Sequence, residues 1–72
     1  MSVFSGRLKE TRQKRIFTQK NISDHLGIAE RAYQNYEYGN REPNLETLVK
    51  LADFFDVSLD YLVGRSDDPT RH

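Results

Sequence analysis

Four polar side chains share one side of residues 29–38 if that stretch is helical. They are Glu30, Arg31, Gln34 and Asn35, and they combine a guanidinium, two carboxamides and a carboxylate. Guanidinium and carboxamide groups form paired hydrogen bonds with planar partners, and a carboxylate accepts from amino groups. The solvated face of an ordinary surface helix carries the same residue types, so the pattern alone leaves recognition and solvation both open.

Side chains suited to catalysis are scarce. The chain has two histidines, His25 and His72, and no cysteine, glycine-rich phosphate loop or metal-ligand spacing. His25 adjoins Leu26 in a segment of helical periodicity, which favours a partly exposed helix residue over a catalytic base. We therefore expect no enzyme activity, no cofactor and no metal site, and no small-molecule ligand is evident.

The length and composition predict one small globular domain. Of the 72 residues, 36% are hydrophobic and 31% are charged, which is a folded rather than a disordered profile. The absence of cysteine rules out disulfides, so the core holds the fold unaided. The longest apolar run is Tyr61-Leu62-Val63, far below the ~18 residues of a membrane helix. These features predict a cytoplasmic protein that does not contact membranes.

Charge is balanced overall but uneven along the chain. Eleven basic residues face eleven acidic ones. Residues 1–20 carry a net charge of 6 − 1 = +5, residues 21–43 carry 2 − 4 = −2, and residues 44–72 carry 3 − 6 = −3. A basic N-terminal part suggests a polyanionic partner, but the neutral total supports that partner less than a strongly basic chain would.

Glycine and proline divide the sequence into helix-sized segments. Apolar residues recur three and four positions apart between Gly27, Gly39, Pro43 and Gly64, and no segment alternates with period two. The inward stripes are Phe4, Leu8 and Thr11; Ile22 and Leu26; Ala32, Tyr33 and Tyr36; Leu45, Leu48, Leu51, Ala52 and Phe55; and Leu59 and Leu62. The pattern predicts an all-α fold of five helices.

Local signals mark the ends of several helices. Thr18 and Ser58 are side chains that cap helix starts, and Gly27 suits a helix end. Residues 1–64 form the predicted domain. Residues 65–72 are polar and lack an apolar anchor, so we expect a frayed tail.

The second and third predicted helices, Thr18–Leu26 and Ala29–Tyr38, are joined through Gly27 with almost no linker. Two helices connected in this way have the geometry of a helix-turn-helix. The small Ser23 lies where the second helix would cross the first. An ordinary helical hairpin within a bundle explains these facts equally well.

A longer series of motifs resembles one family. In order they are Thr18-Gln19, Leu26-Gly27-Ile28, Tyr36 to Pro43, Leu45-Glu46-Thr47-Leu48, Leu51-Ala52, Val57-Ser58-Leu59 and Tyr61-Leu62-Val63-Gly64. In this order and spacing the chain resembles the Cro/C1-type (XRE) repressors of phages and bacteria over about residues 4–64. The resemblance implies a compact lambda-repressor-like domain that binds duplex DNA with its third helix in the major groove.

The resemblance also assigns roles to the polar stripe of the third helix. Arginine pairs with guanine, asparagine or glutamine with adenine, and glutamate accepts from cytosine. We expect Arg31, Gln34 and Asn35 to read bases. Glu30 is the weakest candidate, because a carboxylate near phosphates opposes binding unless it meets a donor.

Further residues match positions that contact the DNA backbone or hold the fold. Gln19 matches a phosphate-holding amide at the start of the second helix, where backbone N–H groups favour anions. Asn40 and Arg41 match backbone-contacting loop positions, and Lys20 is a candidate by charge alone. Arg12 and Glu37 match a structural ion pair that ties the first helix to the third.

Three positions depart from the family pattern. Ile16 stands where glycine commonly ends the first helix, and because a β-branched residue is strained at positive φ we expect a different geometry there. Ala29 replaces a serine or threonine cap. Tyr33 replaces an aliphatic residue, so we expect its hydroxyl to reach solvent or a partner.

Taken together, these residues predict a sequence-specific transcriptional regulator, a repressor of bacterial or phage origin that binds a two-fold related DNA operator as a homodimer. Val57, Tyr61 and Val63 are the predicted dimer interface, although they also fit the edge of a core. The alternative is a protein-binding module such as an antitoxin or adaptor. Salt-sensitive affinity for duplex DNA distinguishes the regulator from that alternative.

Overall fold

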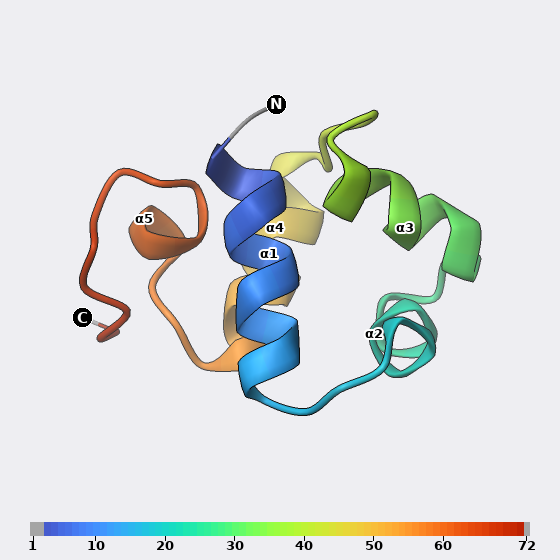
Figure 1. Cartoon of the computed structure of the whole chain (residues 1–72), viewed down its shortest axis with the longest axis horizontal. Helices are drawn as coiled ribbons and strands as arrows, with labels where there is room; N and C mark the ends of the chain where they lie inside the picture. Colours follow the sequence, from blue (N-terminus) through green and yellow to red (C-terminus); the bar gives the residue numbers. More distant parts are fainter. Residues whose placement is uncertain (1–2, 72) are drawn as a thin grey trace.

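The structure is a computed structural model that describes residues 3–71, and within that range the chain is entirely helical. The five helices are α1 (Val3–Lys14), α2 (Gln19–Leu26), α3 (Glu30–Tyr38), α4 (Leu45–Phe55) and α5 (Leu59–Leu62). Figure 1 shows α1 through the middle with α4 drawn behind it, α2 and α3 on one side, and α5 on the other. The prediction of an all-α fold with five helices is confirmed for these residues.

Nine buried apolar side chains form one core that joins all five helices. They are Phe4, Leu8, Ile22, Tyr33, Leu51, Ala52, Phe55, Val57 and Leu62. The inward positions predicted for Phe4, Leu8 and Ile22 are confirmed, and Thr11 is buried one turn after Leu8. Full burial of a large apolar side chain stabilises the fold by roughly 1.5–3 kcal/mol. This core therefore supplies the main driving force for folding.

The apolar stripe of α4 contacts the core from Leu48 onward. Leu51 and Phe55 are buried and Leu48 is half-buried, but Leu45 is 68% exposed. The prediction that Leu45 points inward is therefore wrong. Leu45 is the first residue of α4, nearly two turns before Leu51, so this end of the helix projects beyond the core.

Side-chain caps begin three helices but not α3. The side chains of Thr18, Asn44 and Ser58 each accept a hydrogen bond of 2.9 to 3.0 Å from the N–H three residues further on. Ala29 occupies the capping position of α3 and provides no such bond. A missing cap costs about 1 kcal/mol, so α3 depends on tertiary contacts for its position.

Helix α1 ends in a left-handed turn at Ile16, where φ is 61°. The Ile16 N–H donates to the carbonyl of Gln13 at 3.1 Å, and the Phe17 N–H donates to that of Arg12 at 3.2 Å. Our expectation of a different geometry is wrong. These backbone bonds hold the turn, and Ile16 adopts the strained conformation with its side chain 89% exposed.

The segment after α5 folds back around that helix (Figure 1). It has polar anchors in place of apolar ones: the Ser58 N–H donates to the Pro69 carbonyl at 2.9 Å, and Arg71 lies 2.6 Å from Asp53. Fraying concerns motion in solution and stays a prediction, as does the domain boundary at residue 64. Residues 1, 2 and 72 of the predicted domain and tail, His72 among them, lie outside the described residues.

Replacing Ile16 by glycine should stabilise the fold. A non-glycine residue in the left-handed region lowers the free energy of unfolding by roughly 1–2 kcal/mol. Glycine offsets about 0.5–1 kcal/mol of that gain, because it has more conformational freedom in the unfolded chain. We expect Ile16→Gly to raise the free energy of unfolding, measured in urea, by about 0.5–1 kcal/mol. Arg15→Gly adds glycine one residue earlier, outside the left-handed region, and should lower it. Equal effects of the two substitutions would contradict the strain at Ile16.

Candidate nucleic-acid interface

The start of α2 is fixed by reciprocal hydrogen bonds between Thr18 and Asn21. The Asn21 N–H donates to the Thr18 hydroxyl, and the Thr18 N–H donates to the Asn21 side-chain oxygen, both at 3.0 Å. The helix ends at Gly27, whose φ of 72° suits glycine. Ser23 is 1% exposed, which agrees with the predicted need for a small residue at the crossing. The α2–α3 pair therefore has the tight geometry of a helix-turn-helix.

Helix α3 has one buried and one polar side. Tyr33 and Glu37 are buried, and the ring of Tyr36 meets that of Tyr33 edge-on at 6.3 Å. On the other side, Glu30 and Arg31 are exposed. The carboxamide side chains of Gln34 and Asn35 are half-buried. We call the four residues predicted to read bases the α3 polar face: Glu30, Arg31, Gln34 and Asn35.

A chain of hydrogen bonds runs from the α3 polar face to α1. Gln34 Nε2 donates to Gln19 Oε1 at 3.1 Å, and Gln19 Nε2 donates to Glu37 Oε1 at 3.2 Å. Arg12 completes the chain with Nε to Glu37 Oε2 at 2.6 Å and a second bond of 3.1 Å to Oε1. Gln19, which is predicted to contact DNA, is thus bonded directly to the Arg12–Glu37 ion pair, and Gln34 is linked to that pair through Gln19.

The Glu37 carboxylate is nearly inaccessible, with its side chain 1% exposed. Burial alone would raise the pKa of Glu37, but the hydrogen bonds it accepts, above all from Arg12, outweigh burial and hold that pKa below its usual value. The hydrogen bond to Glu37 likewise raises the pKa of Arg12. Both groups are therefore charged at neutral pH, and the pair is an ion pair rather than a neutral hydrogen bond.

Tyr33 lies beside this pair in the core. Its hydroxyl is buried and makes no hydrogen bond to any other described residue. Burial raises the pKa of that hydroxyl far above its usual range, and the nearby Glu37 carboxylate adds to the effect. The hydroxyl does not reach solvent, so that part of the expectation is wrong. It lies instead close enough to the Glu37 carboxylate for each group to affect the pKa of the other.

The other predicted phosphate contacts lie around the same face. Lys20 is exposed at the start of α2 and lies 3.3 Å from Asp24. Asn40 and Arg41 are exposed after α3, and their N–H groups donate to the Asn35 carbonyl at 3.0 and 3.3 Å. The loop that carries these two residues is thus tied to the C-terminal half of α3.

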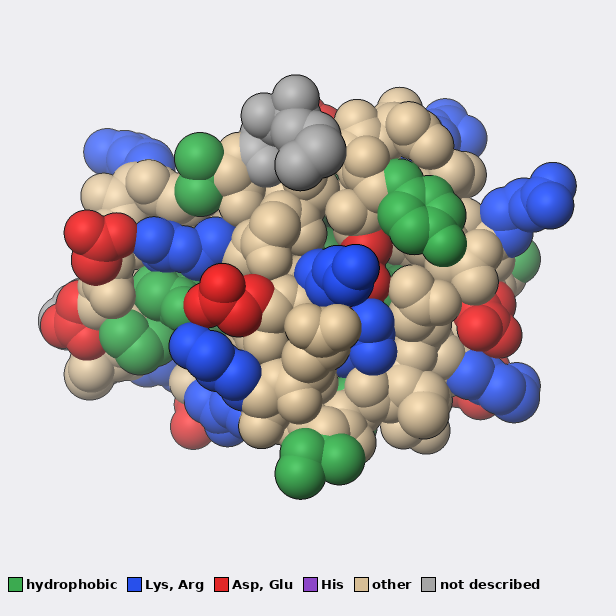
Figure 2. All heavy atoms as spheres, in the orientation of Figure 1, with side chains coloured by type: hydrophobic (Ala, Val, Ile, Leu, Met, Phe, Trp, Pro, Cys, Tyr) green, Lys and Arg blue, Asp and Glu red, His purple; other side chains and the backbone are tan. Residues whose placement is uncertain are grey.

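A hollow of about 470 Å³ opens between α1, the start of α2 and α3. Its polar lining includes Lys9, Gln19, Lys20 and Glu30. Lys9 is exposed, and no ion pair ties it to another described residue. The family motifs did not indicate Lys9, but it lies one turn before Arg12 on α1, and that spacing could have placed it on this side. Figure 2 shows Lys and Arg side chains over the middle of the molecule and on both its α2–α3 side and its α5 side, with Asp and Glu among them.

The residues predicted to form a dimer interface do not share one exposed surface. Val57 is 2% exposed and belongs to the core, so its assignment to an interface is wrong. Val57 lies in the connection between α4 and α5. Helical periodicity does not apply there, so the sequence did not show whether this side chain points into the core. Tyr61 and Val63 are half-buried on and after α5, and the Arg7 guanidinium lies 4.3 Å from the centre of the Tyr61 ring.

Within residues 3–71 no helix has the length and apolar character that crossing a bilayer requires. The same residues contain no group of three or more His, Asp or Glu side chains placed to hold a metal ion.

A helix-turn-helix family model matches residues 8–62 of the chain. The chain is 46% identical over 67 residues to the uncharacterized HTH-type transcriptional regulator YqaE of Bacillus subtilis, which covers 92% of the chain and 58% of YqaE. It is 44% identical over 61 residues to the HTH-type transcriptional regulator ImmR of the same organism. That match covers 85% of the chain and 48% of ImmR. The chain therefore spans about half the length of the curated relatives it matches.

The fold is also similar to that of a solved complex. The P22 c2 repressor, crystallised with a synthetic operator, superposes with a TM-score of 0.82 at 26% sequence identity. The superposition covers 92% of this chain and 100% of that one.

Removing the positive partner of Glu37 should be strongly destabilising. Arg12→Met leaves a buried carboxylate without a cation, which costs roughly 3–5 kcal/mol of the free energy of unfolding. Glu37→Gln added to Arg12→Met removes the uncompensated charge and should recover much of that loss. Chemical denaturation of both variants checks the account, and a double variant no more stable than Arg12→Met would contradict it.

Proposed function

We propose, because this chain belongs to the Cro/C1-type helix-turn-helix family, that it is a sequence-specific transcriptional regulator that binds duplex DNA and acts as a repressor. YqaE and ImmR are named as transcriptional regulators, and the similar P22 c2 repressor is bound to an operator. The observation that carries the proposal is the α3 polar face, presented beside the start of α2 with Gln34 already bonded to Gln19 at 3.1 Å. The major groove is wide enough to admit a helix presented in this way.

The α3 polar face supplies the groups that distinguish bases. We assign Arg31 to guanine, since its exposed guanidinium has two parallel donors. Gln34 and Asn35 are assigned to adenine, and Glu30 to the amino group of cytosine. Gln34 is oriented before binding by its bond to Gln19, so little side-chain entropy is lost when it meets a base.

Residues around the α3 polar face are proposed to supply phosphate contacts, which position the protein without reading sequence. Gln19 and Lys20 flank the start of α2, and Asn40 and Arg41 flank the end of α3. We add Lys9, because it lines from α1 the same hollow that Lys20 lines from α2. The Glu37 carboxylate in this hollow is already neutralised by Arg12, so it opposes a phosphate less than its formal charge suggests.

Two copies are proposed to act together on a two-fold related operator. One chain presents a single short reading helix, and pairing doubles both base and phosphate contacts, with half-sites about one helical turn apart. Of the predicted interface residues, Tyr61 and Val63 are half-buried beside the core rather than within it. We place this pairing surface, Tyr61 and Val63, on the α5 side of the molecule.

The proposal has two further parts. We expect the protein to act in the cytoplasm of a bacterium, with a host or phage gene as its source, in keeping with its bacterial relatives. We also expect its function to need neither catalysis nor a cofactor.

Selection of bound duplexes from a random pool tests the function directly. A repressor of this kind enriches a two-fold symmetric motif whose half-sites lie one helical turn apart, and its affinity falls steeply with salt. Failure to enrich any sequence, together with no duplex affinity at moderate salt, would favour a protein-binding module instead.

Arg31→Ala should relax sequence preference at one base position. If Arg31 pairs with guanine, the variant loses about 1–3 kcal/mol of binding free energy on the selected operator and less on variants of that position. Arg65→Ala makes the same charge change in an exposed residue after α5 and should leave the preference intact. Unchanged selectivity in Arg31→Ala would remove Arg31 from the readers.

Lys9→Ala should weaken binding to all duplexes alike. Loss of one phosphate contact lowers the slope of log affinity against log salt by about one. Lys14→Ala removes a lysine from the same helix that does not line the hollow, and its slope should stay closer to that of the unaltered chain. Equal slopes for the two variants would place Lys9 outside the interface.

A further inference from the structure

The segment after α5 is turned back toward α1 at Gly64. Its φ is 87°, and a Cβ atom there would lie 2.6 Å from Val3 Cγ1, so glycine is required for both backbone conformation and space. The N–H groups of Arg65 and Ser66 then donate to the Asp60 carbonyl at 2.7 and 3.2 Å. We call the segment that follows, residues 65–71, the strap.

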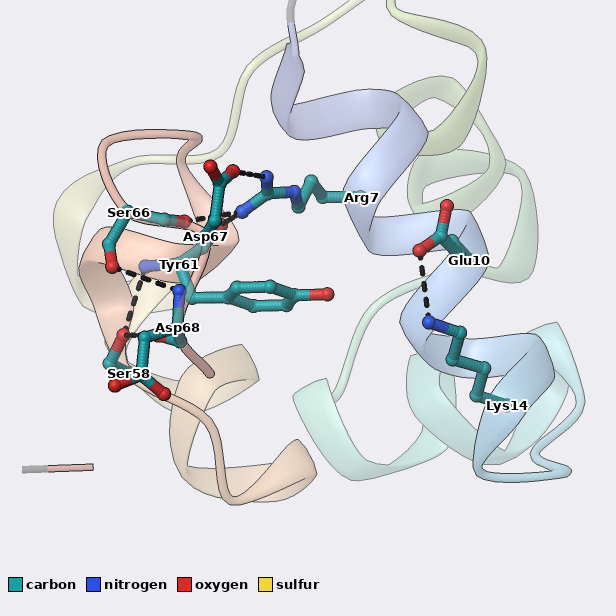
Figure 3. A network of polar contacts seen from close by, with 8 residues as sticks. All are labelled: Arg7, Glu10, Lys14, Ser58, Tyr61, Ser66, Asp67 and Asp68. Atoms are coloured by element: carbon teal, nitrogen blue, oxygen red, sulfur yellow. Dashed lines mark hydrogen bonds and ion pairs between the residues drawn. The ribbon is translucent and has the colours of Figure 1, made fainter. Parts of the chain in front are cut away.

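Arg7 of α1 fastens the first half of the strap (Figure 3). Its guanidinium donates to the carbonyls of Tyr61 at 2.8 Å and Ser66 at 2.6 Å, and pairs with Asp67 at 2.8 Å. Figure 3 shows this guanidinium lying over the Tyr61 ring, and the centre of that ring is 4.3 Å away. The Arg7 side chain is 20% exposed, so these charge-assisted bonds are partly shielded from water.

The second half of the strap is fastened at the opposite side of α5. The Ser58 N–H donates to the Pro69 carbonyl at 2.9 Å. Arg71 then pairs with Asp53 at 2.6 Å and approaches Asp56 to 3.7 Å. The strap therefore runs from α1 around α5 to the end of α4, and it is held at both ends by ion pairs.

The strap covers part of the surface that we propose for pairing. Pro69 lines a hollow of about 120 Å³ together with Tyr61, Val57 and Lys14. Arg7 and the strap thus cover part of Tyr61, which is one of the two residues left for the pairing surface. The strap and a second copy that pairs through Tyr61 would compete for the surface beside this residue.

We propose that the strap is an intramolecular competitor of dimerisation, with Arg7 as its catch. This inference rests on the pairing surface of the proposed function and describes how that surface is regulated. With the strap closed the chain is a monomer, and release of the strap uncovers Tyr61 for a second copy. Each exposed ion pair shifts such an equilibrium by only about two- to five-fold, so modest changes in charge or salt open the strap.

The test measures strap opening and self-association separately in the full chain. Hydrogen exchange of the Ser58 amide reports opening, because its partner is the strap residue Pro69. The Leu62 amide, bonded to the Ser58 carbonyl at 3.1 Å, is the internal reference for unfolding of α5. Sedimentation equilibrium gives the dimer dissociation constant.

Asp67→Asn is the main variant, because the Asp67 side chain is fully exposed and its loss does not disturb the core. We expect Ser58 exchange to rise about two- to five-fold relative to Leu62. Because both copies must open before they pair, the dimer dissociation constant should fall by the square of that factor, about four- to 25-fold. Arg7→Gln removes the whole catch and should change both by more than Asp67→Asn. Glu46→Gln is the matched control: it removes one negative charge and the exposed pair of Glu46 with Lys50, 3.6 Å apart on α4, and should change neither.

Faster Ser58 exchange without tighter self-association would overturn the inference, as would unchanged exchange in both variants at the strap. Duplex binding separates this inference from the proposed function. A chain that enriches a DNA motif but pairs equally in all variants retains the function and loses the inference. A chain that binds no duplex but pairs more tightly in Asp67→Asn loses the DNA-binding function and keeps the strap.

Discussion

The ion pair between Arg12 and Glu37 is the contact on which the rest of the structure depends. It joins α1 to α3 with an Nε to Oε2 distance of 2.6 Å, in a place where the carboxylate has almost no access to water. A buried carboxylate is tolerated only when its oxygens are paired and hydrogen-bonded. Because Ala29, which precedes α3, gives the helix no side-chain cap, this pair and the buried ring of Tyr33 determine where the helix lies.

The same pair extends its influence to the surface. Glu37 accepts a bond from Gln19, and Gln19 accepts one from Gln34, so an ordered line of polar groups connects the interior to the α3 polar face. Side chains ordered before a ligand arrives lose less entropy on binding. The fold itself thus orders the proposed interface, while the side chains of Arg31 and Lys9 are exposed beside it.

Sequence patterns predicted those parts of the molecule that follow a period or a motif. Phe4, Leu8 and Leu51 were found because burial of an apolar side chain repeats with the helix turn. Leu45 and Val57 were misplaced, because periodicity shows neither where a helix leaves the core nor where a connecting residue points. The contacts of Arg7 with residues about sixty positions away leave no local pattern, and the left-handed Ile16 runs against residue preference because backbone bonds around it outweigh the strain.

We propose that the α3 polar face and the start of α2 enter the groove of a DNA duplex as one pre-ordered surface. Side-chain amide resonances of Gln19, Gln34 and Asn35, followed by NMR during titration with a selected operator duplex, test it most directly. The account predicts that these amide signals shift together while backbone signals along α4, such as that of Val49, do not. Shifts confined to α4 and α5, with the three carboxamides unmoved, would contradict it.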